Sequence, residues 1–240
     1  MKFKDRDVHL MDSRVFRQVR QSVQMVFQNP EACLNPHMRV RALIDEALSI
    51  KHSSVSFSLL KDTIDRVRLA EDRLECLPSE LSGGEKRKVT LARALALEPE
   101  FIVADEPVSG LDAITAAQIM NLLKGLGKMG VSFLHISHDL RMIKFLCSRI
   151  MVMYGGRIVE EAPVGVEMVH PYSHLLFASA FRKRMEKSTL RLSHTTDSNV
   201  GCNFRTNCIR YLTERNACCE KEIPVLRELE NGHFVACHLL

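Results

Sequence analysis

Two adjacent carboxylates follow an apolar segment near the middle of the sequence. Residues 101–104 read Phe-Ile-Val-Ala and predict a buried strand, and Asp105 and Glu106 come directly after it. Carboxylates at such a position are costly unless they meet a cation, hydrogen-bond donors or water. Because successive side chains diverge, Asp105 could hold Mg²⁺, directly or through water, while Glu106 polarises an attacking water. Two solvated carboxylates at a strand end are the alternative for this segment alone.

A second segment has the chemistry of an anion site. Four residues begin a helical run that extends to about Leu97: Ser82, Gly83, Gly84 and Glu85. Ser82 and Glu85 match a capping box, and the two glycines let the backbone approach a ligand closely. A helix N-terminus with free N–H groups and a hydroxyl is a ready phosphate site. A capped helix without a ligand explains this segment equally well when it is taken alone.

A histidine follows another apolar run in the same way. Residues 131–136 predict a strand, and Ser137 and His138 come after it. The carboxyl ends of strands are where open α/β sheets place their ligands. Beside a phosphate, His138 could donate to the terminal phosphate or orient the nucleophilic water. A lone histidine at a strand end is more often structural, so this role depends on the residues around it.

The apolar pattern predicts the elements that position these groups. A helix-like stretch at 116–126 separates the two predicted strands, and an earlier apolar run at 23–27 predicts a third. Such alternation indicates an α/β fold with a parallel sheet. Residues 40–76 have apolar side chains at helical spacing and predict a small helical subdomain. Residues 150–160 predict a hairpin whose turn is the Gly-Gly pair at 155–156.

Composition narrows the class of protein. The 240 residues suffice for one substantial domain and a smaller appendage, and the net charge of +4 gives no reason to expect a nucleic-acid partner. The start lacks a secretory signal, and no apolar run approaches the ~20 residues needed to span a bilayer. Eight cysteines in such a chain favour reduced thiols or metal ligands over disulfides. We therefore expect a cytoplasmic protein.

The segments at 81–85 and 101–106 together resemble the ATP-binding subunits of ABC transporters. Leu-Ser-Gly-Gly-Glu is similar to the family's signature motif, which usually has Gln where Glu85 stands. Residues 101–106 are similar to its Walker B motif, with Glu106 as the catalytic glutamate. The resemblance implies that the signature residues contact ATP and that Asp105 holds Mg²⁺.

Three further positions match the family in order and spacing. Residues 109–112 resemble its D-loop, in which Asp112 lies close to the nucleotide, and His138 resembles its switch histidine. Gln28 falls at the Q-loop glutamine, which links the nucleotide site to the transmembrane partner. The resemblance covers nearly the whole chain and implies a P-loop NTPase-like fold that couples ATP binding and hydrolysis to transport.

Two segments resemble the oligopeptide, dipeptide and nickel importers within this family. Residues 27–36 are similar to their extended Q-loop, and residues 170–172, His-Pro-Tyr, follow the ATPase core as they do there. The resemblance implies a subunit held on the inner face of the membrane by permease subunits. It also implies a second ATP-binding subunit, identical or different, and an indirect dependence on a substrate-binding protein. The transported substrate is not encoded in such a subunit.

The cysteines near the end of the sequence agree with this subgroup, in some members of which four cysteines hold an iron–sulfur cluster. The corresponding candidates here, for a cluster or for zinc, are Cys202, Cys208, Cys219 and Cys237. Cys218 competes with Cys219, which has the better spacing to the next proline. The spacing from Cys208 is longer than usual, and a reduced, metal-free tail is the alternative.

No segment matches Gly-x-x-x-x-Gly-Lys-[Ser/Thr], the P-loop that holds the phosphates of a nucleotide. In the family this loop precedes the Q-loop, and the P-loop of one subunit closes on ATP with the signature of the other. We therefore expect an N-terminally incomplete fold with impaired hydrolysis at its own site. Such a chain could still offer Ser82, Gly83 and Gly84 to a partner's nucleotide.

The predicted organisation has five segments. Residues 1–40 are a partial ATPase core, 41–80 a helical subdomain, 81–165 the remaining core, 166–200 an extension with a polar linker, and 201–240 a Cys-rich tail. The leading hypothesis is an ATP-binding subunit of a peptide importer. The alternatives are a non-hydrolytic partner or truncated remnant, and a soluble ABC ATPase of DNA repair or translation. The peptide-type Q-loop and the tail argue against the last.

Overall fold

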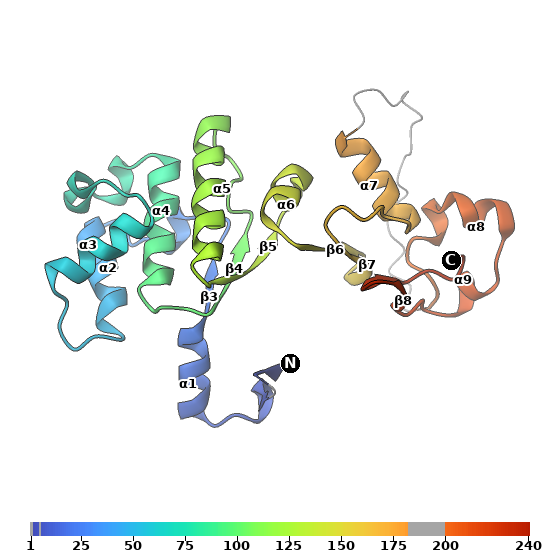
Figure 1. Cartoon of the computed structure of the whole chain (residues 1–240), viewed down its shortest axis with the longest axis horizontal. Helices are drawn as coiled ribbons and strands as arrows, with labels where there is room; N and C mark the ends of the chain where they lie inside the picture. Colours follow the sequence, from blue (N-terminus) through green and yellow to red (C-terminus); the bar gives the residue numbers. More distant parts are fainter. Residues whose placement is uncertain (1, 5, 182–199) are drawn as a thin grey trace. The chain divides into compact units, whose positions relative to one another are not determined.

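The computed structural model describes residues 2–4, 6–181 and 200–240, which form two compact units, Met1–Asp139 and Leu140–Leu240 (Figure 1). The boundary between the units falls inside the predicted segment 81–165, and the five-part organisation stays a prediction. The predicted linker lies outside the described residues except for Val200. Within the described ranges, no helix combines the length and the apolar character that a membrane span requires.

The first unit contains a parallel sheet. Its strands are β3 (Val23–Val26), β4 (Phe101–Asp105) and β5 (Ser132–Ile136), hydrogen-bonded in that order. Val26 pairs with Ala104 and Asp105 pairs with Ile136, so all three strands end at one edge. Ile102 and Ala104, which share one face of β4, are fully buried, whereas the alternate residues on its other face are only half-buried. The predicted α/β fold with a parallel sheet is confirmed.

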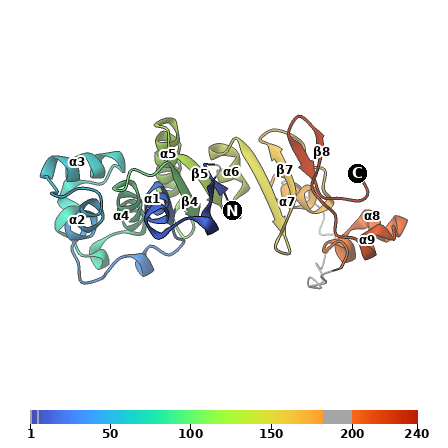
Figure 2. The ribbon, with the colours of Figure 1, turned by 90° about the horizontal axis from the view of Figure 1, so that it is seen from below.

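Helices pack beside this sheet and form the helical subdomain. They are α2 (Val40–Ser49), α3 (Phe57–Arg66), α4 (Gly83–Leu95) and α5 (Ala113–Lys128), whereas α1 (Ser13–Ser22) precedes β3 and buries none of its residues. Helix α2 buries Val40, Leu43, Ile44, Ala47 and Leu48, which recur every three or four residues and so occupy one face. This face packs against α4, beside α3, and Figures 1 and 2 both show the three helices together.

Short elements connect these helices and strands. Strands β1 (Lys2–Phe3) and β2 (Arg6–Asp7) form a small ribbon ahead of α1. Four 3₁₀ turns complete the unit, at Val8–Leu10, Glu31–Cys33, Glu71–Glu75 and Pro78–Glu80. The second of them lies in the segment that follows β3, and the last two lead from α3 into the residues before α4.

The second unit is built around an antiparallel sheet. Its strands β6 (Arg149–Tyr154), β7 (Arg157–Pro163), β8 (Arg227–Glu230) and β9 (His233–Val235) are ordered β6-β7-β9-β8. Gly155 and Gly156 have φ values of +53° and +74°, which confirms the predicted two-glycine turn between β6 and β7. The unit also contains α6 (Leu140–Leu146), α7 (Pro171–Phe181), a 3₁₀ turn at Arg205–Asn207, α8 (Ile209–Glu214) and α9 (Cys218–Lys221). The sequence did not predict that the tail would supply half of this sheet.

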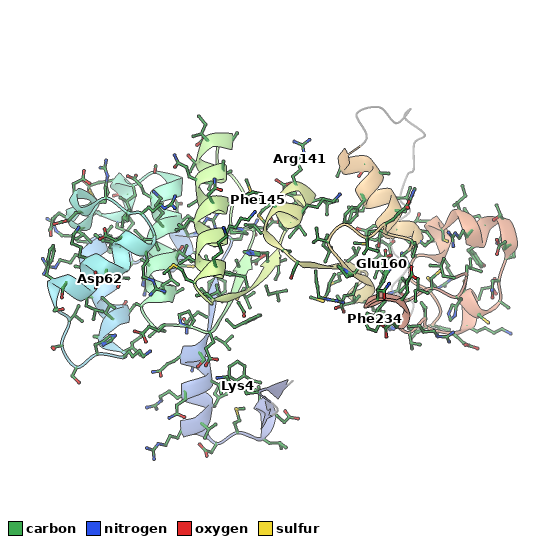
Figure 3. All side chains as sticks on the ribbon, in the orientation of Figure 1. Lys4, Asp62, Arg141, Phe145, Glu160 and Phe234 are labelled. Carbon is green, nitrogen blue, oxygen red and sulfur yellow. The ribbon has the colours of Figure 1, made fainter. Side chains whose placement is uncertain are left out.

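A buried glutamate joins the tail strand β9 to β7 and to the start of α7. Glu160 on β7 is fully buried, and its Oε1 lies 2.7 Å from Nε2 of His233 on β9. The same carboxylate accepts from the amides of Val169 at 2.7 Å and His170 at 3.2 Å. Figure 3 labels Glu160 beside Phe234, its diagonal neighbour on β9. One side chain therefore fixes three segments of this unit, because each of these bonds would be costly to leave unmade.

Candidate functional site

The carboxyl ends of β3, β4 and β5 bring four predicted site residues to one edge of the parallel sheet. Gln28 follows β3, Asp105 and Glu106 end and follow β4, and His138 follows β5. The register of the strands places these positions at the same height. Residues that are far apart in the sequence thus share one sheet edge, the place where α/β folds bind ligands.

Glu106 and His138 are hydrogen-bonded to each other at this edge. Nδ1 of His138 lies 2.6 Å from Oε1 of Glu106, which also accepts from the His138 amide at 3.0 Å. Oε2 of Glu106 accepts from the Ser137 hydroxyl at 3.2 Å. The glutamate side chain is only 14% exposed, whereas the histidine side chain is 81% exposed. The sequence predicted two neighbouring groups with separate roles, but it did not predict that they would form a bonded pair.

Asp105, the other carboxylate at this edge, differs from Glu106 in its hydrogen bonding. It is half-buried, and within the described ranges its carboxylate has no hydrogen-bond or ion-pair partner. Glu106, by contrast, accepts three hydrogen bonds. A carboxylate without a partner at a strand end suits a hard cation such as Mg²⁺, which prefers oxygen ligands. Of the two adjacent carboxylates, Asp105 is therefore the one open to a metal ion.

The predicted capping box is present at the start of α4. The Ser82 amide and hydroxyl each donate to Oε2 of Glu85 at 2.8 Å, and the Glu85 amide lies 3.3 Å from the Ser82 hydroxyl. Hydrogen bonding from the Ser82 backbone lowers the pKa of Glu85. Nε of Arg73 lies 2.9 Å from the other carboxylate oxygen. Positive charge thus stands beside the Glu85 carboxylate.

Gly83 and Gly84 differ in what surrounds them. A Cβ at Gly84 would lie 2.4 Å from Cγ2 of Thr115 on α5, and one at Gly83 would lie 3.3 Å from Cδ2 of Leu111. Gly84 therefore permits a close contact between α4 and α5. The sequence had suggested only that these glycines admit a ligand. The amides of Gly83 and Gly84 occupy the first two helical positions, where no intrahelical acceptor exists.

Asp112 caps α5. Its Oδ1 accepts from the amides of Ile114 and Thr115, both at 3.0 Å, and hydrogen bonding from Thr115 lowers its pKa. A carboxylate at this position satisfies free N–H groups and complements the helix dipole. The structure thus gives Asp112 a local role in addition to the nucleotide contact predicted for it.

An arginine that the sequence analysis did not single out connects three of these segments. Arg87 on α4 is 4% exposed, and its Nη1 donates to the carbonyls of Phe27 at 3.0 Å and Gln28 at 2.8 Å. Its Nη2 donates to the carbonyl of Ser109 at 3.3 Å. Its helical spacing from Gly84 and Leu91, three and four residues away, placed it on the buried face and could have identified it.

Four tail cysteines lie in one region of the second unit. Cys208 and Cys219 are buried with Phe204, and Cys202 packs against the same cluster and donates its amide to the Cys219 carbonyl at 2.9 Å. Burial, reinforced by neighbouring thiols that include Cys237, raises the pKa of Cys219 to about 11. Burial likewise raises the pKa values of Cys202 and Cys237. Across the described ranges, no group of three or more His, Cys, Asp or Glu residues is arranged to hold a metal ion.

The chain is similar to known proteins over much of its length. The family model described as ABC transporter matches residues 1–109. The chain is 35% identical over 254 residues to the oligopeptide transport ATP-binding protein AppF of Bacillus subtilis, covering 99% of this chain and 76% of AppF. It is 35% identical over 241 residues to the oligopeptide transport ATP-binding protein OppF of Haemophilus influenzae, covering 94% and 71%. A solved dimer of the ATP-binding cassette MJ0796, bound to ADP and Pi, superposes with a TM-score of 0.60 at 26% identity, covering 69% of this chain and 73% of that one.

Proposed function

The chain belongs to the ATP-binding proteins of ABC transporters, in the group named for peptide transport, and from this premise we propose that it serves a peptide importer. In this proposal it binds ATP and Mg²⁺ and couples nucleotide-driven closure to permease subunits on the cytoplasmic face of the membrane. A second ATP-binding subunit completes the pair, and a substrate-binding protein delivers the cargo. The observation that carries the proposal is the common sheet edge of Gln28, Asp105, Glu106 and His138.

The roles of the edge residues follow from their surroundings. Asp105, whose carboxylate is open, would hold Mg²⁺, which neutralises charge on the phosphates. Glu106 is the catalytic carboxylate, and its Oε1 accepts from the His138 amide and lies 2.6 Å from Nδ1 of the His138 ring. His138 is exposed and can turn toward a phosphate. The backbone at Gln28 is fixed by Arg87, so the loop that faces the permease has a defined start.

The signature helix supports a role in trans. Gly83 and Gly84 present free amides at the start of α4, beside the Ser82 hydroxyl. In the family, the signature of one subunit closes on a nucleotide held by the P-loop of the other. We therefore place Ser82, Gly83, Gly84 and Glu85, together with Asp112, against a nucleotide held by the partner subunit's phosphate-binding loop.

A complementation experiment tests this role. A complete peptide-importer ATP-binding subunit is given a substitution of its own signature serine, which silences its homodimer. Mixed with this chain, it should regain Mg-ATP hydrolysis, because the chain supplies the missing signature. The chain carrying Ser82→Arg is the control and should restore nothing.

The three possible outcomes are distinct. Restoration that depends on Ser82 supports the proposal. Turnover by the chain alone would show that another of its segments holds the phosphates, and the role in trans would then be wrong. Absence of activity with either version would favour the remnant as the correct alternative.

We propose further that Cys202, Cys208, Cys219 and Cys237 bind an iron–sulfur cluster or zinc. Four neighbouring thiols are the donor set that such centres take. Their arrangement in the described residues is not that of a metal site, so binding requires these side chains to move and to lose their protons. Cys219 is buried whereas Cys218 is exposed, which supports Cys219 as the third ligand.

Anaerobic incubation of the chain with ferrous iron and sulfide, or with zinc, measures this binding. Bound metal per chain should fall in Cys219→Ser and stay unchanged in Cys218→Ser. Equal loss in the two variants, or no binding by the unsubstituted chain, would contradict the assignment.

A further inference from the structure

Arg87 is a buried cation without a carboxylate beside it. None of the ion pairs among the described residues involves Arg87, and burial lowers the pKa of its guanidinium. An arginine keeps its charge even so, because its ordinary pKa lies above ~12. All three of its hydrogen bonds go to backbone carbonyls, those of Phe27, Gln28 and Ser109. Its Nε is buried and makes no bond.

Packing alone does not require an arginine at this position of α4. A buried charge is costly unless it is well hydrogen-bonded, and a methionine or leucine could pack at the same position without that cost. The guanidinium differs from an apolar side chain because its planar fork can donate to carbonyls of two separate loops at once. One loop begins at Gln28, after β3, and the other contains Ser109, after β4.

We propose that Arg87 is a positioning residue that makes the Gln28 loop and the Ser109 segment move together with the signature helix. Closure of the α4 start on a partner's nucleotide would then shift the Gln28 backbone directly, without a signal passing through the sheet. The contacts of Arg87 by themselves support the connection between α4, the Gln28 loop and the Ser109 segment. The claim that this connection transmits closure rests on the proposed function.

A second arginine on the same helix provides a matched control. Arg93 donates to the Cys33 carbonyl at 2.7 Å and to the Glu46 carboxylate at 3.0 Å. It is thus an anchor of the same residue type that has a carboxylate partner and holds the loop after β3 further along, at Cys33, without a hydrogen bond to Gln28 or Ser109. Arg93→Met removes comparable bonds from α4 and reports what general loosening of this helix does.

Hydrogen–deuterium exchange of the full chain tests the connection. Exchange at 27–29 and 108–110 should become roughly tenfold faster in Arg87→Met than in the unsubstituted chain, since charge-assisted bonds that hold both segments are lost. Arg93→Met should change these two segments much less. Arg87→Lys keeps the charge but not the fork and should fall between them, and it decides the question if the methionine variant does not fold.

The same measurement with the signature-silenced partner and Mg-ATP tests the coupling. In the unsubstituted chain, slower exchange at 83–85 should be accompanied by slower exchange at 27–29. In Arg87→Met, only the slowing at 83–85 should remain.

The possible failures can be distinguished. No slowing at 83–85 in any chain would reject the proposed function, while the comparison of isolated variants still decides the role of Arg87. Equal acceleration at 27–29 in the Arg87 and Arg93 variants, or none in either, would overturn the inference.

Discussion

At the scale of single residues, Glu106 shows how backbone and side chain together hold the carboxylate for which we propose a catalytic role. Its φ of +45° lies in the left-handed region, which is costly for a residue with a Cβ. Its amide donates to the Ile136 carbonyl at 2.9 Å, and its carboxylate accepts from Ser137 and His138. These bonds on both ends of the residue stabilise the strained turn. The carboxylate is thereby held against Ser137 and His138, the two residues that follow β5.

His170 leads to a prediction about pH. It is 1% exposed, its Nδ1 accepts from the Tyr172 amide at 3.1 Å, and burial lowers its pKa to about 4. In the unfolded chain a histidine has a pKa near ~6.5. Between these values the unfolded state binds more protons, so the free energy of unfolding should fall as pH decreases from about 6.5 to about 4, by up to ~1.4 kcal/mol per pH unit.

Urea unfolding of His170→Asn across this range provides the check. Asparagine can still cap α7 but does not titrate. The change in the free energy of unfolding per pH unit should therefore decrease by about the contribution of one proton. His135, whose pKa burial also lowers to about 4, should leave a remaining slope of the same sign. His174→Asn, at an exposed position four residues along, is the control. An unchanged slope in His170→Asn would show that His170 titrates normally in the folded chain.

At the scale of elements, β7 carries two adjacent glutamates with opposite exposure. Glu160 is fully buried against His233, while Glu161 pairs with Arg149 at 2.7 Å near the surface. Glu160→Ala should lower the free energy of unfolding by ~3–5 kcal/mol, because it leaves the partners of a buried carboxylate unpaired. Glu161→Ala should cost less than about 1 kcal/mol. Thermal or urea unfolding of the two variants measures both, and similar losses would show that Glu160 does not anchor β9.

The same elements show what could be read from the sequence. The apolar strands β4 and β5 and the Gly-Gly turn were predicted, because each has a local signal in residue type or period. Strands β8 and β9 were not, since β8 reads Arg-Glu-Leu-Glu with every residue exposed, and β9 has three residues. Their pairing depends on distant contacts, such as that of Glu160 with Val235. The helical spacing of Arg87 could have placed it on the buried face of α4, but no local signal predicts which distant carbonyls it bonds to.

At the scale of the whole molecule, two groups of residues should act on different nucleotides of a two-subunit assembly. One group is the signature at the start of α4, and the other is Glu106 with His138. The signature of this chain would serve the partner's nucleotide, whereas Glu106 and His138 face the chain's own strand ends. In the complementation mixture, Glu106→Gln should therefore retain most of the restored ATPase rate, within about twofold, whereas loss of a residue that acts at the reacting phosphate costs ~10²-fold or more. Steady-state phosphate release measures this difference. A large loss in Glu106→Gln would mean that the restored activity depends on the chain's own strand-end residues, and the assignment of the two residue sets to different nucleotides would then be wrong.

The pairing of β7 with β9 also has a consequence for how the protein is made. His233 follows Glu160 by 73 residues, so a ribosome that adds about 5–20 residues per second takes roughly 4–15 s to synthesise the partner of a buried carboxylate. During that interval β7 has only β6 to pair with, and an isolated hairpin is marginally stable. Until β9 is synthesised, the nascent chain thus carries an open strand edge, and such an edge can pair with another chain and aggregate.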